Sequence, residues 1–285
     1  MSNGKVITAE NLVGLLIAAT AVSNANAIPI RVAVEDATGM GGGIATVAQL
    51  NNDTFFDFTA TLVNAAAIDT AAELANYDVV LLGGSGHDNA DWSTAMANAL
   101  VAYVTGGGGL VMTGWGNYDL NSGPADLILE PLVPGQNGPS TNQYTSGSTP
   151  LNFVNGPHAV TAGLPSFAPG ANFIEVNSFA PEVGDLVLAT AANPANIAVA
   201  VKNNIGAGGR SVYLGPLYMA NNSYNTASLR TGFADQLLEQ AVCWAANNCA
   251  PNMAQNVPAP GALALLGLSL VGLGGLRRIG RHRVG

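Results

Sequence analysis

The chain has 285 residues, of which 48% are hydrophobic and only 9% are charged, and its formal net charge is −9. This composition excludes a disordered chain, which requires high charge and few apolar residues. Residues 28–256 carry 17 acidic but only four basic residues, so they repel phosphate backbones and we expect no nucleic-acid partner.

The N-terminal segment has the pattern of a secretion signal. An apolar run from Leu12 to Val22 follows Lys5, and Ala25-Asn26-Ala27 supplies the small residues that a signal peptidase needs. We therefore predict a cleaved signal peptide over residues 1–27 and an exported protein. An apolar N-terminal helix of the domain is the alternative.

Strands and helices alternate through the next part of the chain. Apolar runs predict strands over 30–35, 59–63, 79–82 and 110–113, with helices over 44–52 and 92–104. Asp88 or Asn89 is suited to cap the second helix, and Gly106 to end it. Further strands are expected over 186–190, 197–202 and 211–214, and a last helix over 227–247 with Phe233 and Trp244 on its inner face.

This order predicts a three-layer α/β domain over residues 28–250, with a mostly parallel sheet of the flavodoxin or amidotransferase type. Residues 116–158 are rich in turn formers, and we interpret them as an excursion over the carboxyl edge of the sheet. Residues 251–256 then form a short polar linker.

The chain has two cysteines, Cys243 and Cys249. An exported protein favours a local disulfide between them, with two unpaired thiols as the alternative. No histidine follows at a zinc-like distance, so we predict no metal ion and no cofactor.

The C-terminal segment has no charged residue from Val257 to Leu276, which is long enough for a helix to span a bilayer. The following cluster Arg277, Arg278, Arg281 and Arg283 favours a cytoplasmic end. This order, with the motif Val257, Pro258, Ala259 and Pro260 in front, resembles the PEP-CTERM sorting signal of Gram-negative bacteria.

The resemblance implies a hydrophobic C-terminal helix over 257–285 that holds the protein in the inner membrane in transit. Exosortase would be the transient partner that removes the segment and sends the body to the cell surface or the extracellular matrix. Ala259 stands where the family has glutamate, so cleavage of the tail stays open. A permanent single-span anchor is the plainer alternative.

The body resembles the class I glutamine amidotransferase-like superfamily, in particular its ThuA-like branch, over residues 30–247. Four segments carry the resemblance: YDVVLLGGSG, YVTGGGGLVMTGWG, GPHAVTAGLPSF and GAGGRSVYLGP. Catalytic members place a cysteine nucleophile on the turn after the fourth strand, where this chain has Trp115. The partner histidine is missing from LGPLYMANNSY. The resemblance therefore implies a domain without glutaminase or protease chemistry of the superfamily type.

Two loops at the carboxyl ends of predicted strands supply the candidate ligand-binding residues, because ligands of open α/β sheets bind there. In the first loop, GGSGHD, glycine turns can expose backbone N–H groups, although packing alone also requires glycine there. In the second, a Trp/Tyr pair with polar neighbours is suited to stack on a sugar, with burial of the Trp under the excursion as the alternative. The candidates are Gly84, Ser85, His87, Asp88, Trp115, Asn117 and Asp119.

The sequence therefore favours an exported, non-catalytic binding domain with exopolysaccharide as a candidate partner. The first alternative is a ThuA-like carbohydrate-linked hydrolase that uses His87, Asp88 or Asp119 with water or a metal ion. A purely structural coat protein without a pocket is the second. His158 is expected to support a turn rather than to act as a base.

Overall fold

A computed structural model describes residues 28–36, 42–52, 54–83, 92–120, 125–135, 143–178 and 181–247. The predicted signal peptide, the linker and the hydrophobic C-terminal helix lie outside these residues, as does the loop 84–91. Within the described part of the chain, no helix combines the length and the hydropathy needed to cross a bilayer.

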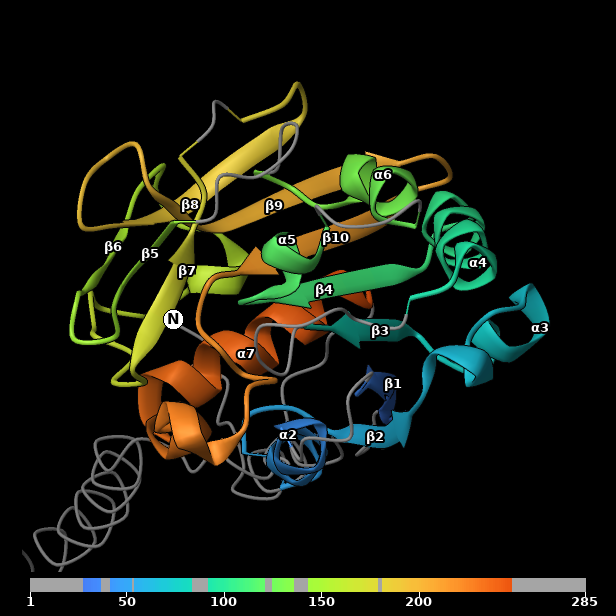
Figure 1. The fold of residues 1–285 in the computed structure, drawn as a ribbon, viewed down its shortest axis with the longest axis horizontal. Helices are drawn as coiled ribbons and strands as arrows, with labels where there is room; N and C mark the ends of the chain where they lie inside the picture. Colours follow the sequence, from blue (N-terminus) through green and yellow to red (C-terminus); the bar gives the residue numbers. More distant parts are fainter. Residues whose placement is uncertain are drawn as a thin grey trace, which may run out of the picture.

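The centre of the molecule is an eight-stranded sheet in the order β2-β1-β3-β4-β10-β9-β8-β6 (Figure 1). Pairing is parallel from β2 through β10 and antiparallel from β10 to β6. The strands are β1 (Ile30–Glu35), β2 (Phe58–Val63), β3 (Val79–Leu82), β4 (Gly109–Thr113), β6 (Leu151–Phe153), β8 (Asp185–Ala191), β9 (Ile197–Ile205) and β10 (Gly209–Leu214).

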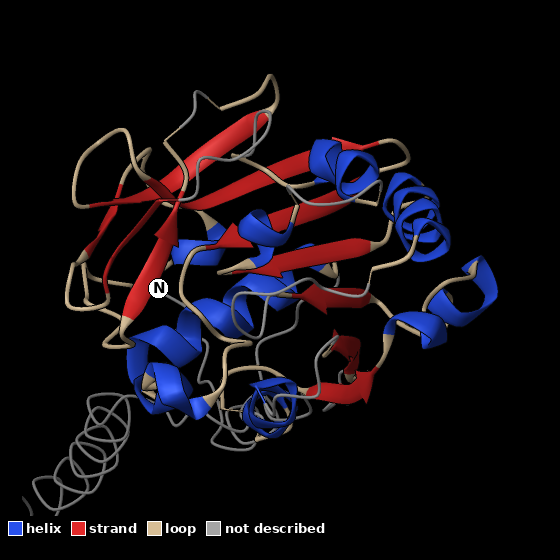
Figure 2. Ribbon diagram, in the orientation of Figure 1, coloured by secondary structure: helices blue, strands red, loops and turns tan. Residues whose placement is uncertain are grey.

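Helices cover both faces of this sheet (Figure 2). Side chains alternate along β3, so that Val79 and Leu81 join one core while Val80 and Leu82 join the other. The first core includes α2 (Gly42–Leu50) and α7 (Gly232–Ala245), and the second includes α3 (Ala71–Leu74), α4 (Thr94–Thr105) and α6 (Asp126–Leu129). The predicted three-layer, mostly parallel α/β fold is confirmed.

Local signals explain where the helices begin and end. Helix α4 is capped by Ser93, whose hydroxyl accepts a hydrogen bond from the Met96 amide at 3.1 Å, and Gly106 ends it as predicted. The capping prediction for Asp88 or Asn89 was wrong, because the helix begins later than expected. In α3, Thr70 and Glu73 form a capping box.

The excursion contains more regular structure than its composition indicates. It includes α5 (Gly116–Asp119) and β5 (Gln143–Ser146), which forms a separate antiparallel ribbon with the later strand β7 (Phe173–Val176). The Glu175 amide of β7 donates to the Gly215 carbonyl at 2.9 Å, just after β10. The ribbon is therefore fixed at the carboxyl end of β10. Short 3-10 turns are formed by Ala65–Ala67, Glu130–Leu132, Ala159–Thr161, Asn222–Tyr224 and Thr226–Arg230.

Helix α7 is fastened to the domain by buried polar groups. The Gln49 amide of α2 donates to Asp235 at 2.7 Å, and Glu239 accepts the backbone amides of Phe55 and Phe56 at 2.8 and 3.0 Å. Burial raises the pKa of the Glu239 carboxyl to about 7 and also raises the pKa of Asp235.

Two predictions on α7 have different outcomes. Phe233 is 46% exposed rather than on the inner face, because in the first turn of α7 it is Ala234 and Asp235 that face the core. Cys243 is buried, and no described cysteine is free. Its predicted partner Cys249 lies outside the described residues, so the Cys243–Cys249 bond stays a prediction.

Candidate functional site

The turn after β4 is tight and closely packed. Trp115 lies in the left-handed region with a φ of 68°. A Cβ atom at position 114 would clash with the Gly215 carbonyl oxygen, and one at 116 would clash with the Met112 sulfur. A left-handed conformation costs a residue other than glycine about 1–2 kcal/mol. The packing around Trp115 must therefore offset this strain.

That packing is an aromatic cluster, which we define as Trp115, Tyr118, Tyr144, Phe173 and Tyr224. The Trp115 ring lies 6.1 Å from Tyr118, 6.2 Å from Tyr144 and 6.4 Å from Tyr224. Tyr144 and Phe173, from the two strands of the ribbon, are 5.0 Å apart. These distances are in the range of favourable edge-to-face ring contacts.

The cluster decides between the two interpretations of Trp115. Its side chain is only 5% exposed and packs on Leu217 and Ala220, whereas Tyr144 is 60% exposed. Of the two interpretations, burial of Trp115 is therefore confirmed, and Tyr144 of the ribbon is one of the rings that cover it. The exposed ring at this turn is contributed by Tyr144.

A buried carboxylate lies beside the same turn. Glu175 is 1% exposed, and its Oε1 accepts the Tyr118 backbone amide at 2.9 Å while its Oε2 accepts the Tyr213 hydroxyl at 3.2 Å. Burial and the neighbouring Glu175 raise the pKa of Tyr213 well above its ordinary value. An amide in the first turn of α5 is thus held by a carboxyl group of the protein itself.

The segment after β10 is also closed by packing. Leu217, Tyr218 and Met219 are fully buried. A Cβ atom added to Gly83 would meet the Met219 side chain at 2.7 Å and would clash with the Thr113 hydroxyl. The described carboxyl ends of β3, β4 and β10 therefore contact one another without a space between them at this point.

The predicted ligand-binding residues are only partly described. Trp115 and Asn117 come together on the turn, and both are buried. Gly84, Ser85, His87 and Asp88 lie outside the described residues, and so does the side chain of Asp119. Convergence of His87, Asp88 and Asp119 as a hydrolase site therefore stays a prediction. The described part of the chain contains no group of three side chains suited to hold a metal ion.

His158 supports a turn, as expected. Its Nδ1 accepts the Val160 amide at 3.2 Å and begins the turn Ala159–Thr161. Its ring packs 5.1 Å from Trp244. Burial, and then the nearby Arg210 charge, lower the pKa of the imidazole.

The sequence did not identify Tyr144 or Glu175 as site residues. Both lie on the ribbon, whose pairing brings them to Trp115 from positions 29 and 60 residues later in the chain. A single acid inside the apolar strand FIEV is the one signal that could have pointed to Glu175.

Comparisons with known proteins agree with this geometry at the level of the fold. No family model matches the chain, and no curated protein matches it. Two solved ThuA-like proteins share its architecture. The protein from Bacteroides uniformis has a TM-score of 0.54 and 16% identity, over 78% of this chain and 93% of its own. The protein from Parabacteroides merdae has a TM-score of 0.52 and 18% identity, over 81% and 94%. The chain thus has the fold of ThuA-like proteins, which is glutamine amidotransferase-like.

Proposed function

We propose that this chain is an exported cell-surface or matrix protein whose amidotransferase-like domain binds a ligand instead of catalysing a reaction. One observation carries the proposal. Trp115 occupies the turn where the superfamily has its cysteine nucleophile, and it is buried among the other rings of the aromatic cluster. An indole has no nucleophilic atom for acyl transfer, and only 5% of the Trp115 residue is exposed.

The ligand that suits this surface is an uncharged polysaccharide. Tyr144 offers an exposed ring for stacking on a sugar face, and the exposed amides Asn172 and Asn222 lie next in the chain to Phe173 and near Tyr224. The acidic surface of residues 28–256 repels uronic acid polymers, so neutral chains are favoured.

Affinity electrophoresis of the full-length protein tests this binding. Its migration in gels with dextran, β-glucan or alginate is compared with that of Tyr144→Ala. We expect a neutral glucan to retard the wild type and the substitution to weaken the retardation markedly. Phe233→Ala removes an exposed aromatic ring on α7 and serves as the matched control. Equal retardation of wild type and Tyr144→Ala would refute the assignment of the surface.

Export and sorting by exosortase are the second part of the proposal. They are supported by the apolar run 12–22, by the motif Val257-Pro258-Ala259-Pro260 and by the terminal arginines. Mass spectrometry of the mature protein from its host would read both termini. We expect an N-terminus at residue 28 and a C-terminus before the uncharged segment.

Deletion of residues 257–285 tests the role of the tail separately. We expect the truncated protein to appear in the soluble periplasm or medium. Retention in the membrane fraction would refute the view that this segment is the anchor.

A further inference from the structure

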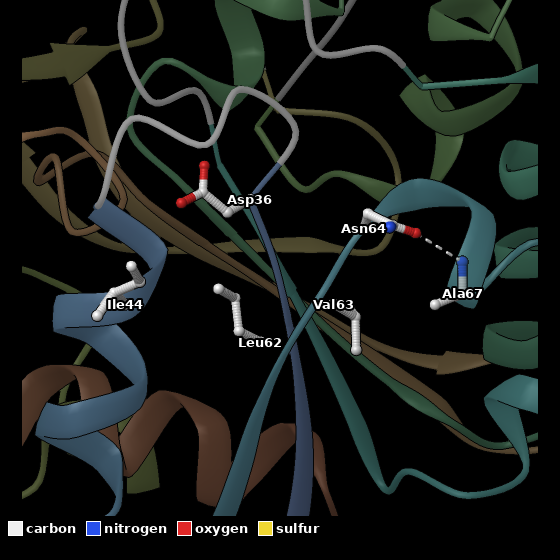
Figure 3. A pocket seen from close by; sticks show the side chains of 6 residues that line it. All are labelled: Asp36, Ile44, Leu62, Val63, Asn64 and Ala67. Atoms are coloured by element: carbon white, nitrogen blue, oxygen red, sulfur yellow. Dashed lines mark hydrogen bonds between the residues drawn. The ribbon is translucent and has the colours of Figure 1, made fainter.

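A second site lies at the carboxyl ends of β1 and β2, away from the turn that bears Trp115. An open pocket of about 340 Å³ is lined by Asp36, Ile44, Leu62, Val63, Asn64 and Ala67 (Figure 3). This volume is at the lower end of ligand pockets, so it is suited to a small molecule or to one end of a chain.

The two polar side chains of the pocket are neighbours because of the strand register. Glu35 of β1 pairs with Val63 of β2 in parallel, so the next residues, Asp36 and Asn64, follow on adjacent strands. Adjacent strands are about 4.8 Å apart. Figure 3 shows the Asp36 carboxyl group on the side of Ile44 and the Asn64 amide on the side of Ala67, with the branched apolar side chains below them.

Each polar group has hydrogen-bonding capacity left over. Asp36 Oδ2 accepts the Gly43 amide at 3.3 Å, which leaves one of its lone pairs for a ligand, while Oδ1 is buried and has no hydrogen-bond partner among the described residues. Asn64 Oδ1 accepts the Ala67 amide at 3.1 Å, and within the described residues its Nδ2 donates to no group. The pocket thus offers an acceptor, Asp36 Oδ2, and a donor, the Asn64 Nδ2 group, on its two sides.

The apolar wall of the pocket consists of exposed aliphatic side chains. Ile44 is 61% exposed and Leu62 is 41% exposed, which is unusual for two large aliphatic side chains side by side. Gly43 allows this approach, because a Cβ atom there would lie 2.7 Å from the Asp36 Cβ and 2.8 Å from the Leu62 Cδ1.

We propose that this pocket binds an uncharged sugar through two of its hydroxyl groups. One hydroxyl donates to Asp36 and the other accepts from Asn64, because a hydroxyl can act in either way. The C–H face of the ring packs against Ile44 and Leu62 and removes their apolar surface from water. An ammonium group would satisfy Asp36 alone, and an anion would be repelled by it.

The test is an NMR titration of the full-length protein with methyl α-glycosides of glucose, galactose and mannose. We expect at least one of them to bind in the millimolar range. Asn64→Ser should lower its affinity about tenfold, because serine still caps the turn Ala65–Ala67 but cannot replace the amide donor. Asn203→Ser changes an exposed amide on β9 and should leave binding unchanged. The thermal midpoint of each variant confirms that it is folded.

Further measurements distinguish this sugar site from a cation site and from the aromatic cluster. Binding of none of the three glycosides, or equal binding by wild type and a folded Asn64→Ser, overturns the proposal. Methylammonium binding that becomes tighter in Asn64→Asp would overturn it in favour of a cation site. The site does not depend on the aromatic cluster, so Tyr144→Ala should bind the glycoside like the wild type even if polysaccharide binding fails.

Discussion

Replacing Trp115 with alanine and with glycine separates two contributions of this residue to stability. The Trp115 side chain is 5% exposed, so its removal should lower the free energy of unfolding by about 3–5 kcal/mol. The backbone at this position has a φ of 68°. Glycine adopts that conformation without strain, so Trp115→Gly should be more stable than Trp115→Ala by about 1 kcal/mol.

Urea unfolding followed by far-UV circular dichroism measures both differences, and it does not depend on the indole that is removed. Ala102→Gly is the control, because Ala102 is exposed inside α4, where glycine should lower stability by about 1 kcal/mol. Glycine therefore has opposite effects at the two positions. If Trp115→Gly were no more stable than Trp115→Ala, the backbone would not be held at positive φ. A loss below 1 kcal/mol would show that the indole is not buried.

Three more predictions concern buried groups elsewhere in the domain. The pKa of Glu239 is about 7 in the folded protein and 4.5 in the unfolded chain, so the folded state binds its proton more tightly. The stabilisation that this protonation provides is fully present below pH 4.5 and is lost as the pH rises through about 7. Glu239→Gln should therefore gain up to about 3 kcal/mol relative to the wild type between pH 4.5 and 8 in urea unfolding, and parallel pH profiles would contradict this. Lys202→Met should lower the unfolding free energy by about 3 kcal/mol, because Asp185 has a fully buried side chain and lies 3.4 Å from the Lys202 ammonium; Lys202→Arg, which keeps the charge, should recover part of the loss. Mass spectrometry of a non-reduced digest should find Cys243 and Cys249 in one linked peptide, and two alkylated thiols would exclude the bond.

The sequence predicted the parallel part of the sheet because its strands are covered on both faces. Such strands are continuous apolar runs, as in Val79–Leu82, and glycine turns separate them from amphipathic helices. The ribbon could not be predicted in this way. β5 reads QYTS with mostly exposed side chains, and it pairs only because β7 is held at Gly215 by a contact distant in the sequence.

The candidate sites were predictable only where one segment carries them. Trp115 and Asn117 belong to one turn, so their positions follow from the end of β4. The exposed Tyr144 and the pocket residues Asp36 and Asn64 depend on strand pairing, which brings together residues 28 or more positions apart. No short pattern in the sequence specifies such a register.

The direction of α7 has a consequence for how the domain would be presented at a surface. Helix α7 ends at Ala245, whose carbonyl is so close to Gly109 that a Cβ atom there would lie 2.6 Å away, and Gly109 begins β4. Arg210, near the start of β10, also bonds the Trp244 carbonyl at 3.0 Å. The chain therefore leaves the domain at the amino edge of the parallel strands, whereas Trp115 and Asp36 lie at the carboxyl edge. If a tether follows Asn247, as proposed, it would be attached at the edge of the sheet opposite both candidate sites. The sites would then face away from the surface to which the tether is bound.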